Sequence, residues 1–136
     1  NYIGPRKRPF HTLNPALALF DDGRVMPYGC MGGEGQPQSQ AALFARYAWL
    51  GYDLAEAVAA PRWVLGRTWG DNDTSLKIED DFSPEIITAL KEAGHVVNPV
   101  KARNDLMGHA GALVRHPDGL LEGASDPRCD GLAAAY

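Results

Sequence analysis

The chain has 136 residues, of which 45% are hydrophobic and 22% charged, and its formal net charge is −4. This length is enough for a core, so residues 1–136 are predicted to form a single domain. The small negative charge without a basic stripe argues against nucleic-acid binding. No apolar run approaches the roughly 18 residues that a membrane-spanning helix needs. Cys30 and Cys129 are far apart and are interpreted as free thiols.

Hydrophobic periodicity and turn residues predict the elements of the first half of the chain. These are an extended segment over 1–15, strands over 16–20 and 24–28, and helices over 37–51 and 54–60. Asp21-Asp22-Gly23 is the turn signal between the two strands. Leu43, Tyr47 and Leu50 share one apolar face of the first helix.

In the second half, five strands and one helix are predicted. The strands are expected over 62–65, 75–79, 95–100, 108–115 and 120–123. Asp53 and Glu56 have the spacing of a capping box for the helix over 54–60, and Ser83-Pro84 begins the next helix. Pro117-Asp118-Gly119 marks a hairpin turn between the last two strands. Because the strands come largely as hairpins, we predict an α+β fold with an antiparallel or mixed sheet.

Gly32 and Gly33 are the most informative residues of the chain. Two adjacent glycines before a helix let a ligand approach backbone N–H groups closely, which suits an anion or a developing oxyanion. A tight strand-to-helix turn that binds nothing explains the pair equally well. The run Gly32-Gly33-Glu34-Gly35 lacks the spacing of a dinucleotide fingerprint, and no Gly-Lys-Ser/Thr follows it. No obvious nucleophile accompanies the pair.

Other polar residues give weaker signals. The histidines have no i, i+4 helical pair and there is no Cys-x-x-Cys, so neither a metal nor a cofactor is predicted. These histidines are His11, His95, His109 and His116. Ser125 and Asp126 could join a histidine in a triad, but no G-x-S-x-G supports one.

Two charged clusters have competing interpretations. Positive charge beside a hydroxyl over residues 6–12 suits a substrate carboxylate, whereas a solvated basic loop is the plainer alternative. The residues concerned are Arg6, Lys7, Arg8, His11 and Thr12. Asp126-Pro127-Arg128 is expected to form a buried ion pair that fixes the last strand.

Four blocks of the sequence, in order, resemble the γ-glutamyltranspeptidase family. Residues 7–15, Lys-Arg-Pro-Phe-His-Thr-Leu-Asn-Pro, resemble K-R-P-x-S-S-M-x-P-T, and residues 29–33, Gly-Cys-Met-Gly-Gly, are similar to G-S-P-G-G. Residues 56–62 resemble E-A-x-x-x-P-R, and residues 123–128 match G-A-S-D-P-R. The blocks extend over nearly the whole chain.

This resemblance implies the four-layer αββα sandwich of the N-terminal-nucleophile hydrolases, with this chain as the C-terminal portion of the small subunit. In that family the precursor cuts itself, and the freed N-terminal threonine attacks an amide. The threonine is expected upstream of Asn1, so this chain alone should be inactive. The implied partners are the large subunit and the N-terminal part of the small subunit. Unpaired strand edges also favour association, including a homo-oligomer.

The resemblance also assigns site residues. The backbone N–H groups of Gly32 and Gly33 stand at the oxyanion hole, and Thr12 stands at the second serine of the pair that holds the substrate α-carboxylate. His11 replaces the first serine, and Met31 replaces the proline before the glycines. The implied substrate is a small amide with a carboxylate, such as a γ-glutamyl compound like glutathione.

The departures at these positions leave alternatives open. The run His-Thr-Leu-Asn-Pro over residues 11–15, together with Gly-Gly-Glu-Gly-Gln-Pro-Gln over residues 32–38, looks more like the divergent branch that includes oxamate amidohydrolase and the cephalosporin-acylase-like enzymes. Oxamate also carries a carboxylate next to its amide. A non-catalytic binding module is the third alternative.

Overall fold

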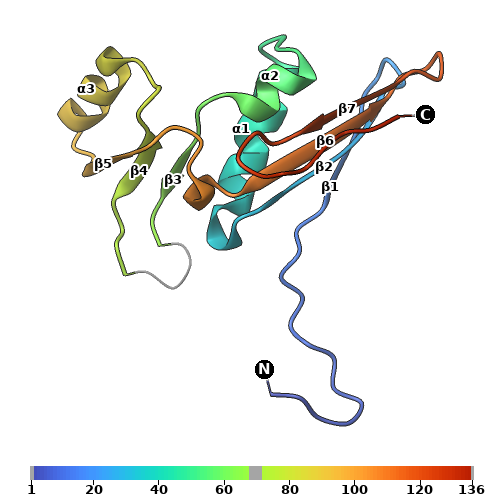
Figure 1. The fold of residues 1–136 in the computed structure, drawn as a ribbon, viewed down its shortest axis with the longest axis horizontal. Helices are drawn as coiled ribbons and strands as arrows, with labels where there is room; N and C mark the ends of the chain where they lie inside the picture. The colour runs from blue at the N-terminus through green and yellow to red at the C-terminus, as the bar shows by residue number, and fades with distance from the viewer. Residues whose placement is uncertain (1, 68–71, 136) are drawn as a thin grey trace.

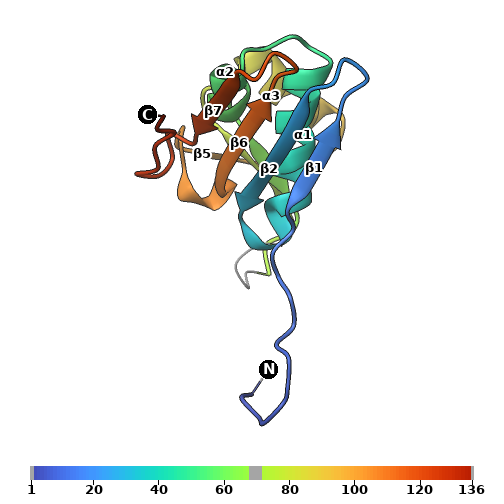
Figure 2. The ribbon, with the colours of Figure 1, turned by 90° about the vertical axis from the view of Figure 1, so that its right-hand side faces the viewer.

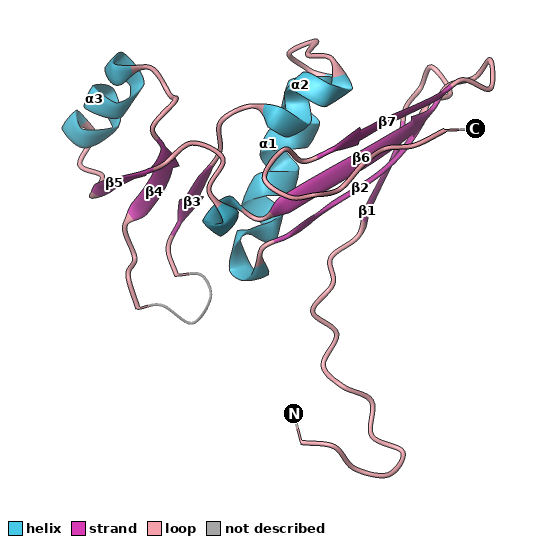
Figure 3. Cartoon of the chain, in the orientation of Figure 1, coloured by secondary structure: helices cyan, strands magenta, loops and turns pink. Residues whose placement is uncertain are grey.

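A computed structural model describes residues 2–67 and 72–135. The strands are β1 (Ala16–Leu19), β2 (Val25–Met31), β3 (Trp63–Leu65), β4 (Leu76–Glu79), β5 (Val97–Val100), β6 (His109–Arg115) and β7 (Leu121–Ser125). The helices are α1 (Gln36–Ala48), α2 (Leu54–Ala59) and α3 (Pro84–Glu92), with short 3-10 turns η1 (Gly33–Gly35) and η2 (Asp105–Met107) (Figure 3). None of the described helices is long and apolar enough to cross a membrane.

The strands form two sheets, which confirms the α+β class with antiparallel and mixed pairing. One sheet has the order β1-β2-β6-β7 and is antiparallel throughout. The other has the order β3-β4-β5, with β4 and β5 parallel. Helices α1 and α2 lie between the two sheets in Figure 1, and α3 lies beside β5. The segment before β1 runs away from the sheet as an extended chain (Figure 2), as predicted.

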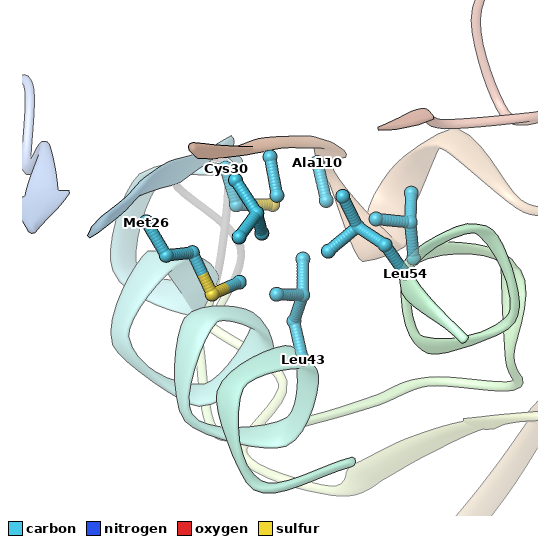
Figure 4. Packing of buried hydrophobic residues seen from close by; sticks show 8 residues of the cluster. Met26, Cys30, Leu43, Leu54 and Ala110 are labelled. Carbon is cyan, nitrogen blue, oxygen red and sulfur yellow. The ribbon is translucent and has the colours of Figure 1, made fainter. Parts of the chain in front are cut away.

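The core fills the space between the four-stranded sheet and helices α1 and α2 (Figure 4). Side chains alternate along a strand, so every second residue of β2 and β6 points into it. The buried cluster consists of Met26, Cys30, Leu43, Leu54, Val58, Ala110, Ala112 and Val114. The opposite face of the same sheet is apolar and exposed, with Leu17, Leu19, Leu113 and Leu121 on its strands.

Several boundaries differ from the sequence predictions. Helix α1 ends at Ala48 rather than 51, so Leu50 is 66% exposed and does not belong to the apolar face. Helix α2 begins after Asp53, but the Asp53 side chain makes no capping hydrogen bond, so the predicted capping box is wrong. Strand β7 continues to Ser125 because its ladder with β6 extends to the Gly111–Ser125 pair. Strand β5 begins at Val97 and pairs directly with β4 in parallel. Helix α3 connects the two strands along the chain, and local turn signals do not predict such a crossover.

Candidate functional site

Strand β2 leads directly into the glycine pair, and the pair leads into a helix. Gly32 follows β2, η1 starts at Gly33, and α1 starts at Gln36. Gly33 has φ 53°, in the left-handed region that glycine adopts without steric cost. The first N–H groups of a helical segment have no acceptor within it and lie at the positive end of the dipole. The turn therefore offers backbone donors to a negative group.

The glycine pair lines a groove of about 660 Å³ at the end of β2. The groove is lined by His11, Thr12, Leu13, Asn14, Pro15, Gly29, Cys30, Met31, Gly32, Gly33, Gln36, His109 and Gly111. The four residues predicted for the site, two glycines and two side chains from the segment before β1, thus line one groove although about 20 residues separate them along the chain. This common location is the main geometric finding at the site.

Helix α1 links the two parts of the groove. The Gln36 side chain donates from Nε2 to the Thr12 carbonyl oxygen at 3.0 Å. One turn further along, Gln40 donates from Nε2 to the Asn14 carbonyl oxygen at 2.6 Å. Because Gln36 directly follows η1, the segment that carries Thr12 is tied to the glycine turn.

Only part of the basic cluster near the start of the chain lines the groove. Arg6, Lys7 and Arg8 are exposed and do not line the groove. Lys7 donates from Nζ to the Tyr2 carbonyl oxygen at 3.0 Å and lies 3.6 Å above the centre of the Tyr2 ring. The solvated-loop interpretation therefore fits these three residues, while His11 and Thr12 lie at the groove.

Cys30 also lines the groove, but its thiol is not activated. The side chain is buried, and its Sγ donates to the Met31 carbonyl oxygen at 3.1 Å. Burial raises the pKa of the Cys30 thiol, and the nearby positive charge of Arg62 offsets only part of this rise. The thiol is therefore protonated at neutral pH and is a poor nucleophile. Cys30 and Cys129 are both free, as predicted.

Four buried charges lie behind the glycine turn. Arg128 donates from Nη1 to Asp126 Oδ1 at 3.1 Å, which confirms the predicted buried ion pair. Arg62 pairs with the same carboxylate, and Glu79 pairs with Arg128. All four side chains are at most 6% exposed. Among the described residues, the Asp126 carboxylate is paired with two arginines and makes no hydrogen bond to a histidine, so the alternative triad with Ser125 does not form there.

The histidines do not gather into a metal centre. His11 and His109 line the groove, while His116 faces Glu122 with Nε2 3.1 Å from Oε2. Within residues 2–67 and 72–135, no group of three or more His, Cys, Asp and Glu side chains is placed to hold a metal ion. The sequence did not indicate His109 and Gln36 as groove residues. His109 reaches the groove because β6 pairs with β2 in the register that sets it opposite Met31, and such pairing is not a local signal.

Comparisons with known proteins identify the family of the chain. The family model for γ-glutamyltranspeptidase matches residues 1–136. The chain is 59% identical over 134 residues to the oxamate amidohydrolase proenzyme of Klebsiella pneumoniae, covering 98% of this chain and 25% of that protein. It is 44% identical to the glutathione hydrolase-like YwrD proenzyme of Bacillus subtilis, again covering 98% of this chain and 25% of that protein.

The fold also matches a solved structure. A mutant γ-glutamyltranspeptidase of Pseudomonas nitroreducens superposes with a TM-score of 0.74 at 25% identity, covering 100% of this chain and 68% of that chain. The fold is thus that of an N-terminal-nucleophile hydrolase of this type. The chain belongs to the γ-glutamyltranspeptidase family. It spans about a quarter of the length of the curated relatives it matches.

Proposed function

We propose that this chain is the C-terminal portion of the small subunit of an amide-cleaving enzyme of the γ-glutamyltranspeptidase family. In this proposal Gly32 and Gly33 supply the oxyanion hole, and Thr12 with His11 supplies part of the substrate carboxylate site. The observation that carries the proposal is the single groove that contains all four residues.

The proposed reaction is acyl transfer from an amide. The hydroxyl oxygen of an N-terminal threonine, in a segment upstream of this chain, attacks the amide carbonyl carbon, and its own α-amino group takes the hydroxyl proton. The carbonyl oxygen becomes negative and is stabilised by the N–H groups of the glycine pair. The amine leaves with a proton, and water or a second amine then releases the acyl group from the threonine.

The substrate proposal has two candidates. A small amide with an adjacent carboxylate, of the oxamate type, is favoured by the 59% identity to oxamate amidohydrolase proenzyme. A γ-glutamyl amide is the second candidate, supported by the 44% identity to a relative named glutathione hydrolase-like.

The rest of the precursor is the proposed partner. The outer face of the four-stranded sheet exposes Leu17, Leu19, Leu113 and Leu121, which are 55–74% exposed. A contiguous apolar face of this kind is typical of a surface that another part of a protein covers. Because the relatives are about four times as long as this chain, the missing layers of the sandwich are the proposed cover.

Thr12→Ala in the whole precursor tests the proposal. A lost hydrogen bond to a charged group is worth about 1.5–3 kcal/mol, so kcat/KM should fall about 10- to 100-fold on the preferred substrate. Thr12→Ser keeps the hydroxyl and should retain most of the activity. A panel of oxamate and γ-glutamyl-p-nitroanilide distinguishes the two substrate candidates. An unchanged kcat/KM of Thr12→Ala on both substrates would contradict the assignment.

The non-catalytic alternative has a separate test. Mass spectrometry of the purified precursor should find two subunits, the smaller with threonine as its first residue. A precursor that stays intact and hydrolyses neither amide would favour a binding module.

A further inference from the structure

Gly108, just before β6, packs directly against the glycine turn. Its φ is 72°, and a Cβ at this position would collide with the Met31 carbonyl oxygen and lie 2.8 Å from Cys30 Sγ. From the other side, a Cβ on Gly32 would lie 3.3 Å from the Gly108 Cα. The contact is backbone against backbone, so the position of residue 108 limits where the turn can lie.

The Gly108 side of this contact, at the start of β6, is anchored by one buried carboxylate and one buried guanidinium. Arg62 donates from Nη2 to the Gly108 carbonyl oxygen at 3.2 Å. Asp126 Oδ2 accepts from the Ala110 N–H at 2.7 Å, and the same oxygen is paired with Arg62 Nη2. Gly108 and Ala110 are thereby held by a single ion pair.

A second ion pair holds the first in place. Glu79 Oε2 accepts from the Arg62 backbone N–H at 2.8 Å. Arg128 donates from Nε to Glu79 Oε1 at 2.8 Å and from Nη1 to Asp126 Oδ1 at 3.1 Å. Two cations and two anions thus form a closed, buried network in which polar groups support one another. The sequence blocks ending in Arg62 and Arg128 contribute no residue to the groove, yet both meet at this network.

We infer that Arg62 and Asp126 are positioning residues for the glycine turn. They hold Gly108 as a support behind Gly32 and thereby fix the direction of the N–H groups that face the groove. For catalysis this inference rests on the proposed function. Donors that act on the developing oxyanion change kcat, because that interaction is made only in the transition state, whereas ground-state contacts set KM.

The experiment compares Arg62→Lys with Arg46→Lys in the whole precursor. Lysine keeps the positive charge near Asp126, but its flexible ammonium group lacks the planar guanidinium that fixes the direction of both donations from Nη2, to Asp126 and to the Gly108 carbonyl oxygen. Arg46 is a matched control, because it is also buried but donates to the carbonyl oxygens of residues 60 and 61. Two readouts are taken: steady-state kinetics on the amide panel, and backbone hydrogen exchange of residues 31–35.

Arg62→Lys is expected to lower kcat about 10- to 100-fold while KM changes less than about threefold, as for a small displacement of catalytic groups. Exchange of residues 31–35 should become at least about tenfold faster in the same variant. Arg46→Lys should leave both readouts within about threefold of the parent protein at a temperature where each variant is folded. Parent-like kcat and exchange in Arg62→Lys, or equal changes in both variants, would overturn the inference.

The exchange readout separates this inference from the proposed function. If the parent precursor cleaves no amide, the proposed function fails, while exchange of residues 31–35 still decides whether Arg62 supports the turn. If Arg62→Lys does not fold, Asp126→Asn replaces it, since that change keeps the size of the side chain but removes the charge that pairs with Arg62. Faster exchange of residues 31–35 in Asp126→Asn would support the inference, and parent-like exchange would overturn it.

Discussion

Glu79 and Arg128 are paired inside the protein, and neither side chain is exposed to solvent. Breaking one partner of such a pair leaves an uncompensated buried charge, which costs about 3–5 kcal/mol. We therefore predict that Glu79→Gln lowers the free energy of unfolding of the whole precursor by this amount, measured by urea denaturation. Glu122→Gln is the control, because Glu122 is partly exposed beside His116, and its loss should cost less than about 1 kcal/mol. Similar losses in both variants would contradict the prediction.

The second prediction concerns acid stability. Burial opposes ionisation of Asp126, but the hydrogen bond from the Ala110 N–H and the charge of Arg62 outweigh it and hold the pKa of Asp126 below its ordinary 3.8. A lowered folded-state pKa stabilises the protein above the ordinary value, and this stabilisation is lost as pH falls through the folded pKa. Asp126→Asn should therefore be less stable than the parent at pH 7 and should lose less stability below about pH 4.

Urea denaturation of both proteins across this pH range checks the expectation. Asp73 also contributes to the acid transition, because hydrogen bonds from the Ser75 backbone N–H and hydroxyl lower the pKa of Asp73 to about 2. This contribution is the same in Asp126→Asn and in the parent protein. Parallel pH profiles of Asp126→Asn and the parent protein would show that Asp126 contributes nothing to the acid transition.

The third prediction concerns the glycine turn itself. Gly33→Ala places a Cβ at φ 53° and should shift the backbone N–H groups that are proposed to form the oxyanion hole. Loss of one oxyanion donor lowers kcat about 10²- to 10³-fold, and we expect a decrease of this order in the whole enzyme. Gly119→Ala is the matched control, because Gly119 also has positive φ, 92°, but lies in the β6–β7 hairpin turn. Steady-state kinetics should show a decrease in kcat only for Gly33→Ala.

The fourth prediction excludes a thiol nucleophile. Cys30→Ser replaces the thiol with the hydroxyl that the family motif carries, and we expect turnover within about threefold of the parent protein. Because burial raises the pKa of Cys30, alkylation of the native protein by iodoacetamide should modify the less buried Cys129 first. Complete loss of activity in Cys30→Ser, or faster alkylation of Cys30, would instead place the thiol in the reaction.

Local signals predicted the hairpins well, because each depends on a few turn residues. The β1–β2 turn contains Gly23 with φ 87°, and the β6–β7 turn contains Gly119 with φ 92°, both positions that favour glycine. The end of α1 was less predictable, since Trp49 and Leu50 continue the helical pattern although the helix ends before them. Apolar periodicity indicates a face but does not say which residues a neighbouring element will cover.

Non-local pairing could not be predicted from the sequence. Residues 62 and 126 lie 64 positions apart, and no spacing rule joins Arg62 to Asp126. The parallel alignment of β4 with β5 likewise depends on where α3 places the returning chain. The ion pair within Asp126-Pro127-Arg128 is predictable because its partners are two residues apart. The larger network is not, because folding brings Arg62 to Asp126 from a distant part of the chain.

The hydrogen bond from Gln36 to the Thr12 carbonyl oxygen has a consequence for substrate choice. In the proposed function, the glycine turn faces the scissile carbonyl and the segment that carries Thr12 faces the substrate carboxylate, and helix α1 holds both. Their separation is then fixed, so the proposed site would select substrates by the number of bonds between carboxylate and amide. An acyl chain one methylene too long or too short would leave one of its two ends unbound.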